Sequence, residues 1–160
     1  MNSVAWMEQG KGNSMTKKLA LAAAMVLAAA GMANAQSGPN TIEVRQVAMA
    51  LLGANFAGIR GVVAAKGEVK TLENPAKAMA RFAGIVPSLF PAGTAAGSNT
   101  KATAEVFSDA AGFKTAAMAL GTAATALAEA AKAGDADAVA AQIKAVGDSC
   151  GNCHKTYRAK

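Results

Sequence analysis

Beyond residue 40, apolar residues recur every three or four positions, and no stretch alternates strictly between apolar and polar residues. This spacing is typical of amphipathic helices rather than half-buried strands. It predicts a first helix from Thr41 to Lys66, which Gly67 ends, as glycine often does just beyond a helix. One stripe along this helix consists of Ile42, Arg45, Met49, Leu52, Phe56, Ile59 and Val63.

A shorter second helix follows. Asn74 suits its N-cap and Pro75 its first position, where the missing N–H costs nothing. Pro87 breaks this helix, and the small and polar residues of 91–100 predict a loop of the kind that often lines a site. The inward face of the helix consists of Met79, Phe82 and Val86.

Two further helices complete the pattern. The third begins near Thr103; Gly134 can end it, and Asp135 can cap the fourth. The stripe of the third helix consists of Val106, Ala110, Phe113, Ala117, Leu120, Ala124, Leu127 and Ala131, and that of the fourth of Val139, Ile143, Val146, Cys150, Cys153 and Tyr157. Steps of three and four match the shallow crossing of antiparallel bundles. We therefore predict an all-α, antiparallel four-helix bundle over residues 36–160.

The most specific chemical signal is Cys150-Gly151-Asn152-Cys153-His154, which holds both cysteines and the only histidine of the chain. Cys-x-x-Cys-His is the attachment motif for c-type haem. Residues three apart share one helix face, so both thiols can form thioether bonds to one porphyrin. His154 can then bind the iron as an axial ligand. The sequence predicts one covalent haem c per chain.

Two other interpretations of these cysteines are weaker. A structural zinc site needs four Cys or His ligands, and only three exist. A reactive thiol pair needs a βαβ context and a helix N-terminus, whereas this pair ends a helical pattern. Because the bundle's apolar positions are mostly alanine, a porphyrin would supply much of the core. We expect the protein without haem to be only marginally stable.

The N-terminal segment has the order of a secretory signal peptide. Met15 is the expected start, after an upstream extension, and basic Lys17 and Lys18 precede an apolar run over 19–30. That run is too short to span a bilayer, so no stable membrane anchor is expected. Cleavage after Ala35 would export residues 36–160 to a bacterial periplasm.

The charge balance excludes one class of partner. The formal net charge of +6 for the whole chain becomes +4 without residues 1–35, since three lysines and one glutamate leave. No basic patch alternates with aromatic residues, so nucleic-acid binding is not expected. The moderate positive charge suits docking to an acidic redox partner protein.

Taken together, the bundle and the C-terminal haem motif resemble the class II cytochromes c, most closely the cytochrome c′ family. The matching pieces are Arg45-Gln46 with Met49 four residues after Arg45, the run 107–114, and the haem motif followed by Tyr157-Arg158. The resemblance covers residues 41–160. It implies a high-spin, five-coordinate haem with His154 as the sole protein ligand, often in a homodimer, and it implies no enzyme activity. Two departures are Phe107, where tryptophan is common, and Pro75.

The resemblance also implies roles for residues around the haem. Arg45 and Gln46 would approach a haem propionate, and Thr100 and Lys101 would make another contact there. The distal pocket would be formed by Met49, Leu52 and Phe56, and Arg158 would lie near the proximal imidazole. Other interpretations stay open: Arg45 as a solvated helix-end charge, and Arg158 as a cation favoured by the helix dipole.

Met49 decides between two functions. If it only fills a gap in the core, the iron keeps an open site in an apolar pocket. That site disfavours charged ligands and admits NO or CO, and the haem can also transfer electrons. If the Met49 thioether binds the iron, the protein is a low-spin electron carrier.

Overall fold

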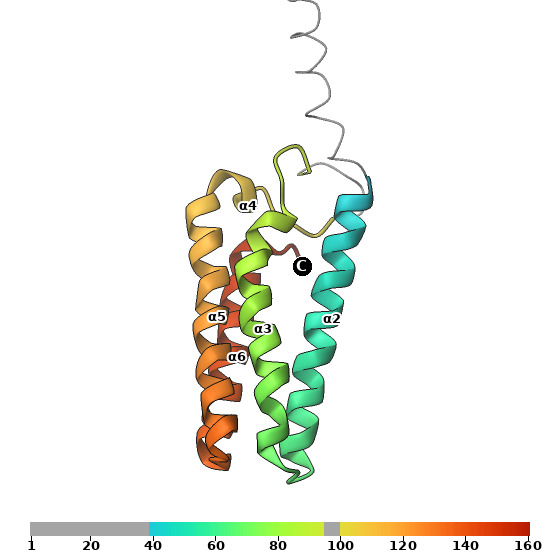
Figure 1. Ribbon diagram of the computed structural model, residues 1–160. Helices are drawn as coiled ribbons and strands as arrows, with labels where there is room; N and C mark the ends of the chain where they lie inside the picture. The colour runs from blue at the N-terminus through green and yellow to red at the C-terminus, as the bar shows by residue number, and fades with distance from the viewer. Residues whose placement is uncertain (1–38, 95–99) are drawn as a thin grey trace, which may run out of the picture. The chain divides into compact units, whose positions relative to one another are not determined.

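The structure, a computed structural model, describes residues 39–94 and 100–160. Within them, four long helices run alternately up and down: α2 (Pro39–Ala64), α3 (Glu73–Ile85), α5 (Ala110–Ala133) and α6 (Ala136–Tyr157) (Figure 1). The predicted all-α, antiparallel four-helix bundle is therefore confirmed. The predicted leader over 1–35, with its start and cleavage site, lies outside the described residues and stays a prediction.

The start of the second long helix differs from its prediction. A 3₁₀ turn, η1 (Val69–Leu72), leads directly into α3, and the Glu73 N–H donates to the carbonyl of Lys70. Asn74 is therefore not the N-cap; it lies with Pro75 inside the first turn. Proline is tolerated there because the N–H groups of a first turn have no partner within the helix. A second 3₁₀ turn, η2 (Val86–Leu89), contains Pro87 and ends the segment as expected.

The predicted third helix is interrupted. A single turn, α4 (Glu105–Ser108), ends at Asp109, whose backbone leaves the helical region at φ −119° and ψ 56°. The Asp109 carboxylate then caps α5 by accepting from the Gly112 N–H at 3.0 Å. Ala110, predicted to be buried, is exposed because it begins this new helix. Asp109 is a helix start that the continuous apolar stripe concealed.

The predicted boundary between α5 and α6 is confirmed. Gly134 adopts a left-handed conformation, φ +76°, and its N–H bonds to the last carbonyls of α5. Asp135 caps α6 by accepting from the Ala138 N–H at 2.9 Å. Both residues act through backbone chemistry that their type and position specify.

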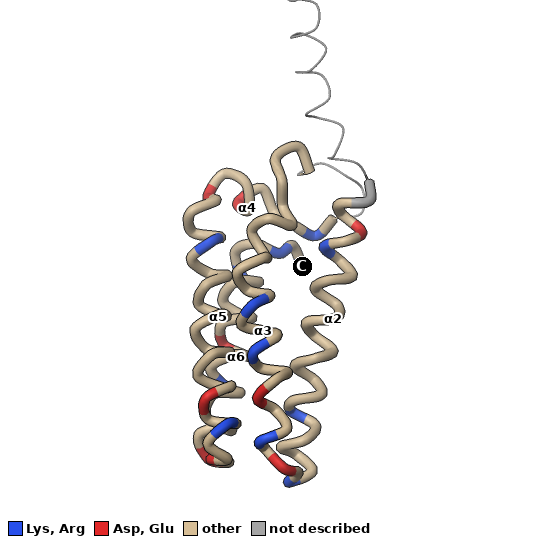
Figure 2. Tube along the Cα trace, viewed as in Figure 1, with Lys and Arg blue, Asp and Glu red and all other residues tan. Residues whose placement is uncertain are grey.

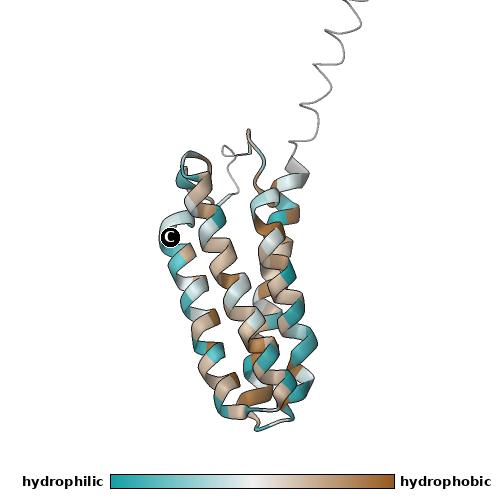
Figure 3. Cartoon of the chain, turned by 60° about the vertical axis from the view of Figure 1, so that its left-hand side comes forward, coloured by the Kyte–Doolittle hydropathy of each residue, from teal (hydrophilic) through white to brown (hydrophobic). Residues whose placement is uncertain are grey.

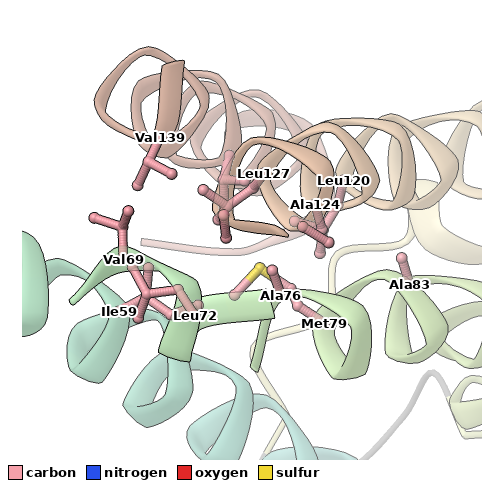
Figure 4. Packing of buried hydrophobic residues seen from close by; sticks show 13 residues of the cluster. Ile59, Val69, Leu72, Ala76, Met79, Ala83, Leu120, Ala124, Leu127 and Val139 are labelled. Carbon is pink, nitrogen blue, oxygen red and sulfur yellow. The ribbon is translucent and has the colours of Figure 1, made fainter. Parts of the chain in front are cut away.

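The core consists of two clusters of buried apolar side chains. The first cluster contains Ile59, Val69, Leu72, Ala76, Met79, Ala83, Leu120, Ala124, Leu127, Ala128, Ala131, Val139 and Val146 (Figure 4). The second cluster contains Val86, Val106, Phe113 and Ala117. Figure 3, coloured by hydropathy, shows segments of intermediate tan to white colour along the helices. Small residues let α3 and α5 approach closely: a Cβ added at Gly121 would lie 3.3 Å from that of Ala83.

Helix α2 is the least covered of the four. No charged residue occurs from Gln46 to Ile59, as the uninterrupted tan stretch of α2 in Figure 2 shows. By length and composition Thr41–Ala64 could also cross a membrane, and its buried residues are Arg45 and Ile59. Val44, Val47 and Leu51 remain 50%, 52% and 66% exposed. This helix thus presents one face to the core and an apolar face outward.

Candidate haem site

The haem motif lies in the last turns of α6, which stays helical through Tyr157. Cys150 and Cys153 are one turn apart on this helix, and both are free and half-buried. Cys150 packs against the first cluster and Cys153 against the second. The two thiols thus lie one turn apart on α6, each packed against one of the two clusters, a spacing that suits attachment to one porphyrin edge.

The surroundings of the thiols do not suit the other interpretations. Burial raises the pKa of both Cys150 and Cys153. A reactive thiol needs the opposite shift, because the thiolate is the nucleophile. In the described part of the chain, no three His, Cys, Asp or Glu side chains gather closely enough to hold a metal ion among themselves. This donor set fits a covalently attached haem better than a thiol redox pair or a zinc site.

His154 follows Cys153 on α6 and is more than a third exposed. Partial desolvation of the ring, and then the positive charge of Arg158, lower the pKa of His154. Both effects favour the neutral imidazole, which is the form that binds a metal. Residue type, position beside the two cysteines and electrostatics all suit an axial iron ligand.

Three half-buried residues of α2 lie opposite the haem motif. Met49 packs against the second cluster, as Cys153 does, while Leu52 and Phe56 pack against the first, as Cys150 does. A Cβ added at Gly147, one turn before Cys150, would lie 3.9 Å from the tip of the Phe56 ring. The predicted distal residues and the haem cysteines thus meet in the same two clusters.

Arg45 is buried rather than solvated, with 3% exposure. Its guanidinium donates to the hydroxyl of Thr94 at 3.0 Å, to the Thr94 carbonyl at 3.2 Å and to the hydroxyl of Thr100. It also lies 4.7 Å from the centre of the Phe90 ring. Sequence reasoning missed Thr94 and Phe90, and only the loop prediction over 91–100 pointed towards Thr94.

These contacts leave a buried positive charge with neutral partners. Within the described residues, no carboxylate forms an ion pair with Arg45, and burial lowers its pKa. A buried guanidinium is best stabilised by a carboxylate, which it can bind through two N–H groups. These three hydrogen bonds use three of the five N–H groups of the guanidinium. This residue therefore fits an anionic group such as a haem propionate.

The other predicted residues divide into two groups. Thr100 lies at Arg45, as expected for one site. The backbone of Lys101, the next residue, pairs with the C-terminal segment: its carbonyl accepts from the Ala159 N–H at 2.8 Å, and Ala102 pairs with Arg158. Gln46, Lys101 and Arg158 are exposed. The roles of these three residues beside the haem stay predictions.

Fold and site together define a c-type haem protein built on an antiparallel helical bundle. The family model for cytochrome c′ matches residues 40–158. The chain is also 37% identical over 120 residues to cytochrome c′ of Pararhodospirillum photometricum, covering 73% of this chain and 94% of that one. The chain therefore belongs to the cytochrome c′ family, whose members bind covalent haem c.

Solved structures agree with this assignment. A nitric oxide complex of a cytochrome c′ variant from Alcaligenes xylosoxidans matches with a TM-score of 0.67 and 30% identity, over 76% of this chain and 94% of that one. A cytochrome c′ described by its ligand-controlled dimer dissociation matches with a TM-score of 0.70 and 30% identity, over 76% and 95%. The sequence-based resemblance is confirmed.

Proposed function

We propose that this protein is a periplasmic cytochrome c′ that binds NO and CO at an open haem site and transfers single electrons. The observation that carries the proposal is the placement of Cys150 and Cys153 in the same two clusters as the apolar residues of α2. The nitric oxide complex of a relative supports gas binding. The bound haem supplies an iron centre that can change oxidation state and bind a diatomic gas.

The residues of the chain have distinct roles in this proposal. Cys150 and Cys153 tether the haem, and His154 binds the iron on the proximal side, near Arg158. Met49, Leu52 and Phe56 form an apolar distal wall, which disfavours charged ligands because their desolvation is costly. The propionate side is formed by Arg45, Gln46, Thr100 and Lys101, among which Arg45 is best placed to neutralise a buried carboxylate.

The alternative is a low-spin electron carrier in which the Met49 thioether is the sixth ligand. Met49 supports it by its position, since it is half-buried on α2 and shares the second cluster with Cys153. A thioether bound to iron raises the reduction potential and closes the gas site. The two proposals therefore differ in spin state and in their response to CO.

An absorption spectrum of the reduced protein, with and without CO, decides between them. The full chain is produced with a cytochrome maturation system. A high-spin spectrum that shifts with CO supports the open site, and Met49→Ala should then change it little. A sharp low-spin spectrum that CO leaves unchanged, and that Met49→Ala converts to high spin, would establish the alternative. Met118→Ala, at a 47% exposed residue of α5, is the matched control.

Export and partner choice are proposals from the sequence. Cell fractionation, with the mass of the purified chain, tests whether cleavage after Ala35 leaves a periplasmic protein carrying one haem. A full-length cytoplasmic protein with two free thiols would refute the proposed location and function together. The net charge of +4 expected for residues 36–160 favours an acidic redox partner.

The outward face of α2 supports a homodimer. Val44, Val47 and Leu51 lie three and four residues apart, so they share one side of the helix. Dimer dissociation is described for a structural relative. We infer that a second copy of this chain covers the exposed apolar face of α2.

A further inference from the structure

The last turn of α6 is tied to the start of α5 by one side-chain hydrogen bond. The Tyr157 hydroxyl donates to Asp109 Oδ2 at 2.7 Å, although the two residues are 48 positions apart. The other carboxylate oxygen, Oδ1, accepts from the Gly112 N–H and caps α5. One carboxylate thus begins α5 and holds the end of α6.

Gly112 provides the room for this hydrogen bond. A Cβ added there would lie 2.6 Å from the Tyr157 hydroxyl oxygen and would overlap Asp109 Oδ2. Alanine normally stabilises a helix relative to glycine by about 1 kcal/mol. Helix propensity therefore does not account for a glycine in the first turn of α5. The close approach of Tyr157 and Asp109 does, because only glycine leaves room for it.

Packing and backbone contacts hold the same turn. The Tyr157 ring meets Phe113 of the second cluster edge-on, with ring centres 5.2 Å apart. The Thr103 N–H donates to the Tyr157 carbonyl at 3.2 Å, and Ala102 pairs with Arg158. Tyr157 is thus fixed by its ring, its hydroxyl and its carbonyl.

The turn that Tyr157 ends also contains His154. The Arg158 N–H donates to the His154 carbonyl at 3.3 Å, so His154 belongs to the turn that Tyr157 ends. None of the described residues forms a hydrogen bond with the His154 ring that would orient it. The direction of the imidazole therefore depends on how firmly the last turn of α6 is held.

We propose that Tyr157 and Asp109 are positioning residues for His154, and that their hydrogen bond, which needs Gly112, fixes the direction from which the imidazole meets the iron. This inference rests on the proposed axial role of His154. It assigns a function to three residues that do not touch the iron. It also explains why the sequence begins α5 anew at Asp109 instead of continuing α4.

The test uses the haem-loaded protein and two measurements. The iron–histidine stretching band of the reduced protein reports the direction and strength of that bond. Hydrogen exchange of the 155–158 amides reports how firmly the turn is held, whichever ligand occupies the distal side. Tyr157→Phe keeps the ring against Phe113 and removes only the hydroxyl. We expect it to shift or broaden the stretching band and to speed exchange several-fold.

Three variants make the test specific. Gly112→Ala should act in the same direction as Tyr157→Phe despite its better helix propensity. Asp109→Asn keeps one oxygen to accept from the Gly112 N–H and cap α5, and it places an NH2 donor where Oδ2 accepted from Tyr157. The Tyr157 hydroxyl can accept from this NH2, so this variant should change both measurements less than Tyr157→Phe does. Lys144→Met removes an exposed hydrogen bond to Asp148 elsewhere on α6 and is the control, expected to change neither measurement.

The outcomes separate this inference from the proposed function. If the wild-type protein binds haem and CO but Tyr157→Phe and Gly112→Ala behave like Lys144→Met, the positioning role is wrong and the function stands. If the wild-type protein lacks covalent haem, both fail. A Gly112→Ala variant with slower exchange than the wild type would also overturn the positioning role, because it would show that glycine is not needed for the contact.

Discussion

The guanidinium of Arg45 on α2 bonds both the hydroxyl and the carbonyl oxygen of Thr94, 49 positions later in the chain. Thr94 is itself 2% exposed, and its hydroxyl donates to the carbonyl of Pro91 at 2.7 Å. These bonds hold the segment after η2 against the helix that is least covered by the bundle. Arg45 therefore has a structural role in addition to the proposed propionate contact.

Replacing Arg45 by methionine should destabilise the protein. The substitution keeps the apolar length of the side chain but leaves two Thr94 oxygens without their donor, at a cost of about 1–3 kcal/mol. Urea unfolding of the haem protein measures the loss. Arg60→Met is the matched control, because Arg60 is an exposed arginine of the same helix whose guanidinium lies 5.2 Å from the Phe56 ring. Equal losses in the two variants would contradict the structural role of Arg45.

The Tyr157–Asp109 hydrogen bond predicts a pH dependence of stability. It raises the pKa of Tyr157 to about 12 and lowers that of Asp109. Because the pKa of Tyr157 is raised on folding, Tyr157 stabilises the folded protein fully at pH values below its pKa in the unfolded chain, ~10. This stabilisation is lost as the pH rises through about 12. The lowered pKa of Asp109 means that its contribution is lost as the pH falls below ~4.

The chain has one tyrosine, so its absorbance change reports Tyr157 alone. Difference titration should place the phenol midpoint near 12 in the wild-type protein. Tyr157→Phe should remove the loss of stability across the alkaline range and reduce the acid loss. An alkaline loss that persists unchanged in Tyr157→Phe, or a wild-type phenol midpoint near ~10, would contradict the hydrogen bond.

Replacing either of two glycines by alanine should change the stability of the protein, in opposite directions. Gly134 follows the end of α5 with φ +76°, a backbone conformation in which a Cβ is strained. Gly134→Ala should therefore lower the free energy of unfolding by about 1 kcal/mol. Gly53 is exposed within α2, and a Cβ there meets nothing within 4 Å. Gly53→Ala should therefore raise the free energy of unfolding by up to about 1 kcal/mol. Thermal unfolding of the two haem-loaded variants checks both signs, and a stabilised Gly134→Ala would contradict the left-handed helix end.

Periodicity predicted most of the fold, because the bundle is built from local patterns. The stripes of three and four marked the four long helices, and Gly134 and Asp135 marked the last helix boundary. Asp109 was missed since its apolar neighbours on both sides keep the same spacing across the break. Asn74 was misassigned because the 3₁₀ turn before it supplies the first backbone bond, which a residue-type rule does not detect.

Some residues of the site could likewise be predicted from local sequence, and others could not. Cys150, Cys153 and His154 are recognisable because the chemistry needs those residue types at that spacing. Thr94 and Phe90 could not be found, since their contacts with Arg45 join segments about fifty residues apart and depend on the path of the loop. The bond between Tyr157 and Asp109 is also non-local. Only the coincidence of a first-turn glycine with an aspartate three residues earlier hinted at an unusual helix start.

Loss of the haem should weaken one part of the bundle more than the other. The second cluster contains only four buried apolar side chains, whereas the first is much larger. A Cys150→Ala/Cys153→Ala variant made without haem should melt at least roughly 10 °C lower, because about 1 kcal/mol corresponds to several degrees in a domain of this size.

Hydrogen exchange should show which part is lost. Amides of α3 and α5 next to the first cluster should stay protected, and those of α4 and the end of α6 should exchange fast. Cys153→Ala alone, still tethered through Cys150, is the control and should keep most of the stability. A haem-free variant as stable as the wild type would contradict a core completed by the porphyrin.

The exposed face of α2 predicts the last result. Wild-type protein should sediment as a dimer at micromolar concentration, because Val44, Val47 and Leu51 together form an apolar strip that a second α2 can cover. Leu51→Lys should weaken association by about 100-fold or more, since a charge would be buried without a partner. Ile85→Lys is the matched control, as Ile85 is a 52% exposed apolar residue of α3. A monomeric wild-type protein would show that the dimer does not form. A dimer that Ile85→Lys disrupts and Leu51→Lys does not would show that the interface lies elsewhere than on α2.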